Sequence, residues 1–331
     1  MAASLRALLA GILDYAGIFP PANLSLDRAI RNYARHQKSR DRWMLGRFVV
    51  PAARLSELAP FDKLFDEDPP FIFSVLGRGG KTGDEFLQGL SADLADIETF
   101  RQTHAGKVEV DVFEVKLPDE MGWGRNHHLA RYTLVRAAEE IETYGPPALT
   151  PFLEIGLMDD WRGAVESAAA LIHYLASYGE QRMHGAYQRC RPAGFKLRCG
   201  GTTAAAVLSP EQVAHVLAVC RAEGIVLKAT AGLHQPFRHQ DESLNTPVHG
   251  FLNLFVAAVL AATHRLEEPR LQQIIEDTEA SHFNFDDDGL RWGEFGASVE
   301  EIAVARQQFA VGFGSCSFDE PREALRGLKL L

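Results

Sequence analysis

The feature that most constrains this chain is the alternation of short apolar runs with amphipathic helical segments over nearly its whole length. The apolar runs are rich in Val, Ile, Leu and Phe, which is typical of buried β-strands. They lie at 11–17, 43–51, 70–76, 108–117 and 148–157, around Lys196, around Lys228, and at 309–314. Eight strands that each lead into a helix predict an α/β fold, the (β/α)8 TIM barrel, for these 331 residues.

The length beyond a minimal barrel is concentrated between the seventh and eighth strands. We expect an insertion at about 234–298, with helices at 250–264 and 270–277 and a hairpin around 283–292. No repeat beyond the strand–helix unit and no interdomain linker is recognisable, so one barrel domain over 1–331 is expected. The segment 251–262 is apolar on nearly all sides. This predicts burial within the chain or, as the second choice, a contact in a homo-oligomer.

Charge and composition exclude several classes of partner. The net charge of −10 and the absence of a Lys/Arg cluster argue against nucleic acid, and the apolar run at 251–263 is too short to span a membrane. The four cysteines are scattered without a C-x-x-C motif, which favours a reducing, cytoplasmic location. No G-x-G-x-x-G follows the first strand, which argues against a doubly wound dinucleotide fold, and we expect no cofactor. A small-molecule substrate remains as the expected partner.

Two lysines stand in the sixth and seventh apolar runs, and each is followed four residues later by a glycine. Lys196 and Lys228 are on consecutive strands, so a parallel barrel would place them side by side. A second ammonium and desolvation would lower the pKa of one amine, which could then attack a carbonyl and form a Schiff base. This is the design of a class I aldolase. The alternative is that one or both lysines lie at strand ends and reach solvent or pair with Glu114 or Glu154.

Other polar side chains stand at the carboxyl ends of the predicted strands, where barrel enzymes place their sites. On the fourth strand, alternation places either Asp111 or Glu114 with Lys116 toward the barrel interior, unless a bulge intervenes. After the eighth strand, the glycines and hydroxyls of 312–317 could bind an anion through backbone N–H groups at a helix start. A plain glycine-rich turn with a capping serine is the alternative.

Five short segments near these strand ends carry a family resemblance. They are LDYAGI at 13–18, VEVDV at 108–112, GFKLRCG at 194–200, KATAGL at 228–233 and FGSCS at 313–317. In this order they resemble motifs of the deoxyribose-phosphate aldolase family of barrels. The resemblance implies that Lys196 is the Schiff-base nucleophile, Lys228 the partner that lowers its pKa, and Asp111 the proton shuttle. It also implies that 313–317 holds a substrate phosphate.

The chain departs from that family in several places. Leu197 and Arg198 replace two small hydroxyl residues after the nucleophilic lysine, Glu114 and Glu154 add carboxylates, and the long connection before the last strand has no counterpart. We therefore expect a divergent relative acting on a small, anionic or phosphorylated carbonyl compound. Its catalytic residues would be Lys196, Lys228 and Asp111. Its substrate-binding residues would be Asp14, Arg47, Glu114, Glu154, Arg198, Gly232, His234, Arg238, Gly314, Ser315, Cys316 and Ser317.

Two other functions remain open at this point. His234, His239 and His249 follow the seventh strand and, with Glu114 or Glu154, could bind a metal ion in a metal-dependent lyase or hydrolase. Their spacing matches no known ligand pattern, and the preferred interpretation assigns no metal. A barrel that binds a ligand without chemistry is the last alternative, against which the pair of lysines argues.

Overall fold

The computed structural model describes residues 1–66, 69–123, 127–157, 160–182 and 190–331, with the side chains of 177–182 not described. Eight strands form a closed parallel barrel in the order β1-β13-β7-β6-β5-β4-β3-β2, which confirms the predicted fold class. The strands are β1 (Leu13–Tyr15), β2 (Leu45–Pro51), β3 (Phe71–Leu76), β4 (Val108–Lys116), β5 (Thr150–Glu154), β6 (Gly194–Arg198), β7 (Leu227–Thr230) and β13 (Ala310–Ser315).

α-Helices follow the barrel strands as predicted except after β2, where a 3-10 stretch stands instead. Several begin at capping residues that are visible in the sequence. The helices are α1 (Ala3–Leu9), α2 (Leu26–Gln37), α3 (Gly83–Thr103), α4 (His127–Tyr144), α5 (Trp161–Arg182), α6 (Pro210–Ala222), α7 (Phe251–His264), α8 (Glu268–Glu276), α9 (Val299–Gln308) and α10 (Asp319–Gly327). Thr82 caps α3, and Ser209 with Gln212 forms a capping box on α6. Within the described residues, no helix has the length and apolarity needed to cross a bilayer.

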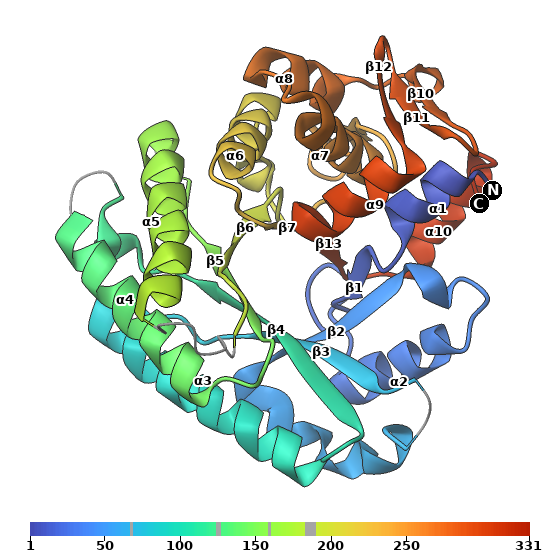
Figure 1. Cartoon of the computed structure of the whole chain (residues 1–331). Helices are drawn as coiled ribbons and strands as arrows, with labels where there is room; N and C mark the ends of the chain where they lie inside the picture. The colour runs from blue at the N-terminus through green and yellow to red at the C-terminus, as the bar shows by residue number, and fades with distance from the viewer. Residues whose placement is uncertain (67–68, 124–126, 158–159, 183–189) are drawn as a thin grey trace. The chain divides into compact units, whose positions relative to one another are not determined.

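The chain divides into two compact units, each described here by itself. The first comprises Met1–Leu24, Arg35–Gly46 and Leu197–Leu331, and the second comprises Ser25–Ala34 and Arg47–Lys196. In the second unit, β3, β4 and β5 pair in parallel, and α3, α4 and α5 lie outside them (Figure 1). Lys196 belongs to the second unit and Lys228 to the first.

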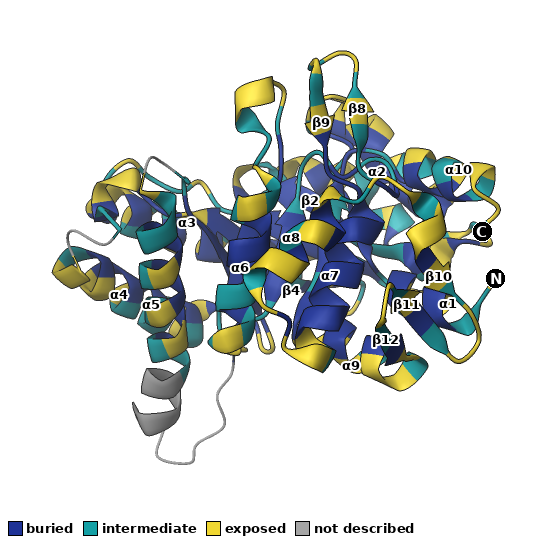
Figure 2. Ribbon diagram, turned by 90° about the horizontal axis from the view of Figure 1, so that it is seen from above, coloured by how far each residue is buried: buried dark blue, intermediate teal, exposed yellow. Residues whose placement is uncertain are grey.

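The connection between β7 and β13 is more structured than expected. A short hairpin of β8 (His239–Asp241) and β9 (Thr246–Val248) lies in the loop that carries the histidines. Instead of a two-stranded hairpin, β10 (Phe283–Phe285), β11 (Gly289–Trp292) and β12 (Phe295–Ser298) form a three-stranded antiparallel sheet. The predicted burial of the apolar helix is confirmed, because every residue of α7 from Phe251 to Ala261 is buried (Figure 2). The ring of Phe251 stacks on that of Phe313 of β13.

Candidate active site

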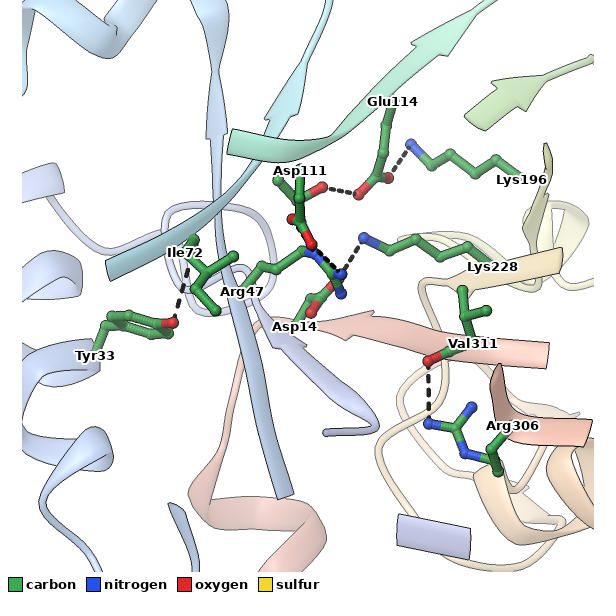
Figure 3. A network of polar contacts seen from close by, with 11 residues as sticks. Asp14, Tyr33, Arg47, Ile72, Asp111, Glu114, Lys196, Lys228, Arg306 and Val311 are labelled. Atoms are coloured by element: carbon green, nitrogen blue, oxygen red, sulfur yellow. Dashed lines mark hydrogen bonds and ion pairs between the residues drawn. The ribbon is translucent and has the colours of Figure 1, made fainter. Parts of the chain in front are cut away.

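Lys196 lies on β6 and contacts carboxylates on β5, the adjacent strand, and on β4, the strand after it in the barrel order. Its side chain is buried, with 5% of the residue exposed. Its Nζ atom lies 3.0 Å from Glu114 Oε2 on β4 (Figure 3). It also lies 3.0 Å from Glu154 Oε2 on β5. The parallel register sets Glu154 directly beside Lys196. We call these three residues the lysine–glutamate cluster.

A β-bulge in β4 decides which of its acidic residues takes part. Phe73 of β3 pairs with Val110, but the next residue, Ser74, pairs with Val112, so Asp111 is the extra residue in β4. Glu114 is consequently directed into the buried cluster, and Lys116 is half exposed and pairs with Asp119. The strict alternation that would have forced a choice between Asp111 and Glu114 does not hold across the bulge.

Ser74 is part of the cluster, although the sequence analysis did not single it out. It is completely buried on β3, and its Oγ donates a hydrogen bond of 2.5 Å to Glu114 Oε1. Glu114 therefore accepts from a hydroxyl through one oxygen and contacts the Lys196 ammonium through the other. The available signal was a lone polar residue in the apolar strand Phe71–Leu76.

The electrostatics of Lys196 differ from the expectation. Burial is the largest single influence and lowers the pKa of the amine, but Glu114 and Glu154 together outweigh it and raise the pKa above its ordinary value. The expected lowering of this pKa is therefore wrong for the structure, in which Lys196 rests as an ammonium ion. An amine in this cluster becomes a nucleophile only after one of the carboxylates takes its proton.

Lys228 lies on β7 in the first unit, where it pairs with Asp14 of β1 (Figure 3). Only 1% of Lys228 and 2% of Asp14 are exposed. A Cβ atom added to Gly46 would overlap Asp14 Oδ1, so the glycine makes room for this carboxylate. Asp14, which was expected to bind substrate, therefore holds an ammonium ion.

Asp111 and Arg47 form a bidentate ion pair in the second unit (Figure 3). Arg47 Nε and Nη2 donate to the two carboxylate oxygens of Asp111 at 2.6 Å each. Both side chains are partly exposed, at 25% and 33%. Asp111 thus holds the planar guanidinium in a fixed orientation through the two-bond geometry typical of arginine–carboxylate pairs.

The residues expected to hold a phosphate make hydrogen bonds within their own turn. Ser317 N–H donates to Ser315 Oγ at 3.3 Å, and Glu320 N–H donates to Ser317 Oγ at 3.1 Å. The Cys316 thiol is buried, which raises its pKa. The first turn of α10 carries Asp319 and Glu320, whose charge opposes a second anion. Nothing in these contacts favours a phosphate over the alternative of a capped turn.

Glycines bring backbone segments of the first unit close together at the ends of β6, β7 and β13. A Cβ added to Gly232, which has φ +73°, would lie 3.3 Å from Gly200 Cα. A Cβ on Gly314 would lie 3.1 Å from Thr230 Oγ1. Arg198, at the end of β6, is exposed. At Gly232 and Gly314 the lack of a side chain allows this close approach of the backbone.

The three histidines after β7 have three different partners. His234 Nδ1 contacts Glu320 at 3.1 Å, and His239 Nδ1 contacts the Phe237 carbonyl at 3.0 Å. His249 Nε2 donates to the Leu208 carbonyl at 2.8 Å, and Arg238 Nη1 lies 3.3 Å from its Nδ1. Burial lowers the pKa of His249 to about 4, so its ring is neutral near pH 7. Among the described residues, no group of three or more His, Cys, Asp or Glu is arranged to hold a metal ion.

Comparisons with known proteins add no relative to this picture. No protein-family model matches the chain, and no curated protein is significantly similar to it. A barrel fold by itself is compatible with many chemistries, so it does not identify the reaction. Only the side chains of the site can therefore indicate the reaction.

Proposed function

We propose that this chain is a class I, Schiff-base aldolase-like lyase that acts on a small anionic carbonyl compound, with Lys196 as the amine. One observation carries the proposal: a buried lysine on barrel strand β6 contacts two carboxylates, one on the adjacent strand β5 and one on β4, each at 3.0 Å. Imine formation needs an amine, a group that removes its proton, and a group that returns a proton to the departing water. The lysine–glutamate cluster contains all three.

The same cluster can perform both halves of a carbon–carbon cleavage. A carboxylate removes a proton from the Lys196 ammonium, the neutral amine adds to the carbonyl, and the protonated carboxyl returns its proton as water leaves. The iminium ion then accepts the electron pair of the breaking carbon–carbon bond while a carboxylate takes the proton of the β-hydroxyl. The raised pKa of Lys196 fits a proton that is transferred within the cluster during each turnover.

The anionic character of the substrate is supported by the arginine of the second unit. Arg47 is only partly buried, and the bidentate contact with Asp111 fixes its guanidinium plane. A carboxylate or phosphate of the substrate is the natural ligand for such a side chain. The resemblance to the deoxyribose-phosphate aldolase family supports the same reaction class. In this proposal Asp111 orients Arg47, and proton transfer is assigned to the glutamates.

Borohydride trapping tests the amine directly. The protein is incubated with pyruvate, glyoxylate, dihydroxyacetone phosphate or glyceraldehyde 3-phosphate, reduced, and analysed by peptide mass spectrometry. The expected product is a secondary amine on Lys196, lost in Lys196→Met and retained in Lys116→Met, which changes a half-exposed lysine of β4. Absence of any adduct on Lys196 across the panel would contradict the proposal.

The raised pKa of Lys196 also favours a second candidate, in which the ammonium ion is never deprotonated. A carboxylate would then remove a proton next to the substrate carbonyl, and the ammonium would stabilise the enolate electrostatically. Such an enzyme would exchange the methyl hydrogens of pyruvate with deuterium from the solvent and yield no borohydride adduct. The two measurements made on one sample separate the candidates.

A further inference from the structure

The two glutamates that flank Lys196 have different surroundings. Glu114 contacts Lys196 through Oε2 and accepts a hydrogen bond from Ser74 through Oε1. Glu154 contacts Lys196 through Oε2, and the described residues show no hydroxyl donor to its carboxylate. The Glu154 side chain is also the more exposed of the two, at 10% against 4%. The cluster is therefore asymmetric although its two ion pairs have equal length.

We propose that Ser74 is a positioning residue that keeps Glu114 ionised beside Lys196, so that Glu154 is the carboxylate that accepts and returns the proton. This inference rests on the proposed Schiff-base function. It assigns different tasks to two residues that the sequence offers as equivalent, and it gives a role to a serine that no motif contains.

The assignment follows from what each hydrogen bond does to a carboxylate. A hydroxyl that donates to a carboxylate stabilises its charged form and makes it a weaker proton acceptor. Ser74 is completely buried, so water does not compete strongly for Glu114 Oε1. Because Ser74 and Glu114 are both on barrel strands, their side chains are fixed by packing, and the hydrogen bond persists during the reaction. Glu154 is left as the stronger proton acceptor of the cluster.

With this assignment, every proton transferred during imine formation has a donor and an acceptor. Lys196 gives one ammonium proton to the Glu154 carboxylate, and the neutral amine attacks the carbonyl carbon. The proton that the attacking nitrogen loses moves to the former carbonyl oxygen, which gives the neutral carbinolamine. Glu154 then protonates this hydroxyl, the carbon–oxygen bond breaks, and water leaves as the iminium forms. Glu154 ends ionised, and Glu114 stays an anion throughout, beside the ammonium ion at the start and the iminium ion at the end.

A titration that needs no substrate tests the role of Ser74. The protein is labelled with [5-13C]glutamate, and the resonances of the two residues are assigned with Glu114→Gln and Glu154→Gln. Ser74→Ala should raise the titration midpoint of Glu114 by about one pH unit, and Ser74→Thr, which keeps a hydroxyl, should restore it. The titration of the other glutamate should not move. An unchanged Glu114 midpoint in a folded Ser74→Ala protein would overturn the inference, as would equal shifts of both residues.

The reaction itself tests the division of tasks, with the initial rate of borohydride-trapped adduct formation from glyoxylate measured between pH 5 and 9. In the wild type the rate of adduct formation should fall as the pH is lowered toward 5, because Glu154 becomes protonated. Glu154→Gln should slow adduct formation about 100-fold or more and should remove this fall. Glu114→Gln should slow adduct formation less and should keep the fall. The reverse pattern overturns the inference. If the wild type forms no adduct but the carboxyl titrations behave as stated, the Schiff-base function fails while the role of Ser74 stands.

Discussion

The two buried lysines of this barrel differ in the carboxylates beside them. Lys196 contacts two carboxylates, those of Glu114 and Glu154, each at 3.0 Å. Lys228 pairs with the carboxylate of Asp14. A carboxylate in excess can accept a proton while the other still faces the lysine. Both lysines are buried, so the proposed function depends on the second carboxylate beside Lys196 and not on burial alone.

Replacement of each lysine by methionine should separate the two environments most strongly. Lys228→Met removes the cation beside buried Asp14, and breaking such a pair costs about 3–5 kcal/mol of unfolding free energy. Lys196→Met leaves two carboxylates facing each other, so its cost at pH 8 should be at least as large. That cost should shrink at pH 5, because one carboxyl of a close pair takes up a proton.

Urea unfolding followed by circular dichroism measures both variants at the two pH values. The double variant Asp14→Asn with Lys228→Met should recover part of the loss, because it removes the uncompensated charge. Lys116→Met is the control and should stay within about 0.5 kcal/mol of the wild type, since its ion pair is exposed. If the cost in unfolding free energy depended equally on pH in Lys196→Met and Lys228→Met, the two lysines would not differ in the carboxylates beside them.

The barrel and the identity of the two lysines could be predicted from local patterns. Apolar runs rich in β-formers and capping residues such as Ser209 are properties of short segments, and these segments folded as predicted. After the second strand, where a helix was expected as after every strand, the chain forms a 3-10 stretch at Ala52–Leu64, which contains Pro60. The first strand is shorter than predicted, and α1 was not foreseen.

The side-chain contacts of the site could not be predicted from local patterns. Whether Glu114 faces the cluster depends on the bulge at Asp111, and a bulge depends on register with a strand about 40 residues away in sequence. The contact of Ser74 with Glu114 depends on that same register. The resemblance pointed to Lys196, but the raised pKa of its amine depends on carboxylates that the resembling family does not supply.

Gly46 lies beside Asp14 in the environment of Lys228, and its substitution should have a smaller effect on the unfolding free energy than loss of a lysine. A Cβ at Gly46 would overlap the Asp14 carboxylate, and Gly46 belongs to the first unit, whereas the lysine–glutamate cluster belongs to the second. Gly46→Ala should therefore displace Asp14 from Lys228 and cost about 1–3 kcal/mol of unfolding free energy. Borohydride trapping on Lys196 should persist in this variant.

Gly327→Ala provides the matched control for that substitution. An added Cβ there meets nothing within 4 Å, and the residue lies in the last turn of α10. Alanine is the better helix former, so the variant should be neutral or more stable by up to about 1 kcal/mol. Thermal unfolding of both variants measures the difference. Equal stability of Gly46→Ala and the wild type would mean that Asp14 is not held where the structure places it.

The smallest expected effect concerns acid sensitivity, which should differ between the two units. Burial lowers the pKa of His249 in the first unit from 6.5 to about 4, so between these values the unfolded chain binds a proton that the folded chain does not. Stability conferred by the neutral ring is complete above pH 6.5 and is lost as the pH falls toward 4. From pH 7 to 5.5 the loss is about 1 kcal/mol.

Hydrogen exchange, corrected for its intrinsic pH dependence, locates this loss. Protection of the amides at the start of α7 should fall about tenfold between pH 7 and 5.5, while the amides of β4 keep theirs. His249→Gln retains a donor for the Leu208 carbonyl and should remove the fall, and His127→Gln, at an exposed position of α4, should leave it unchanged. Because the lysine–glutamate cluster depends on carboxylates and not on a histidine, it should keep its structure over this range. An equal loss of protection in β4 and α7 would show that acid destabilises the whole barrel. The two units would then not differ in acid sensitivity.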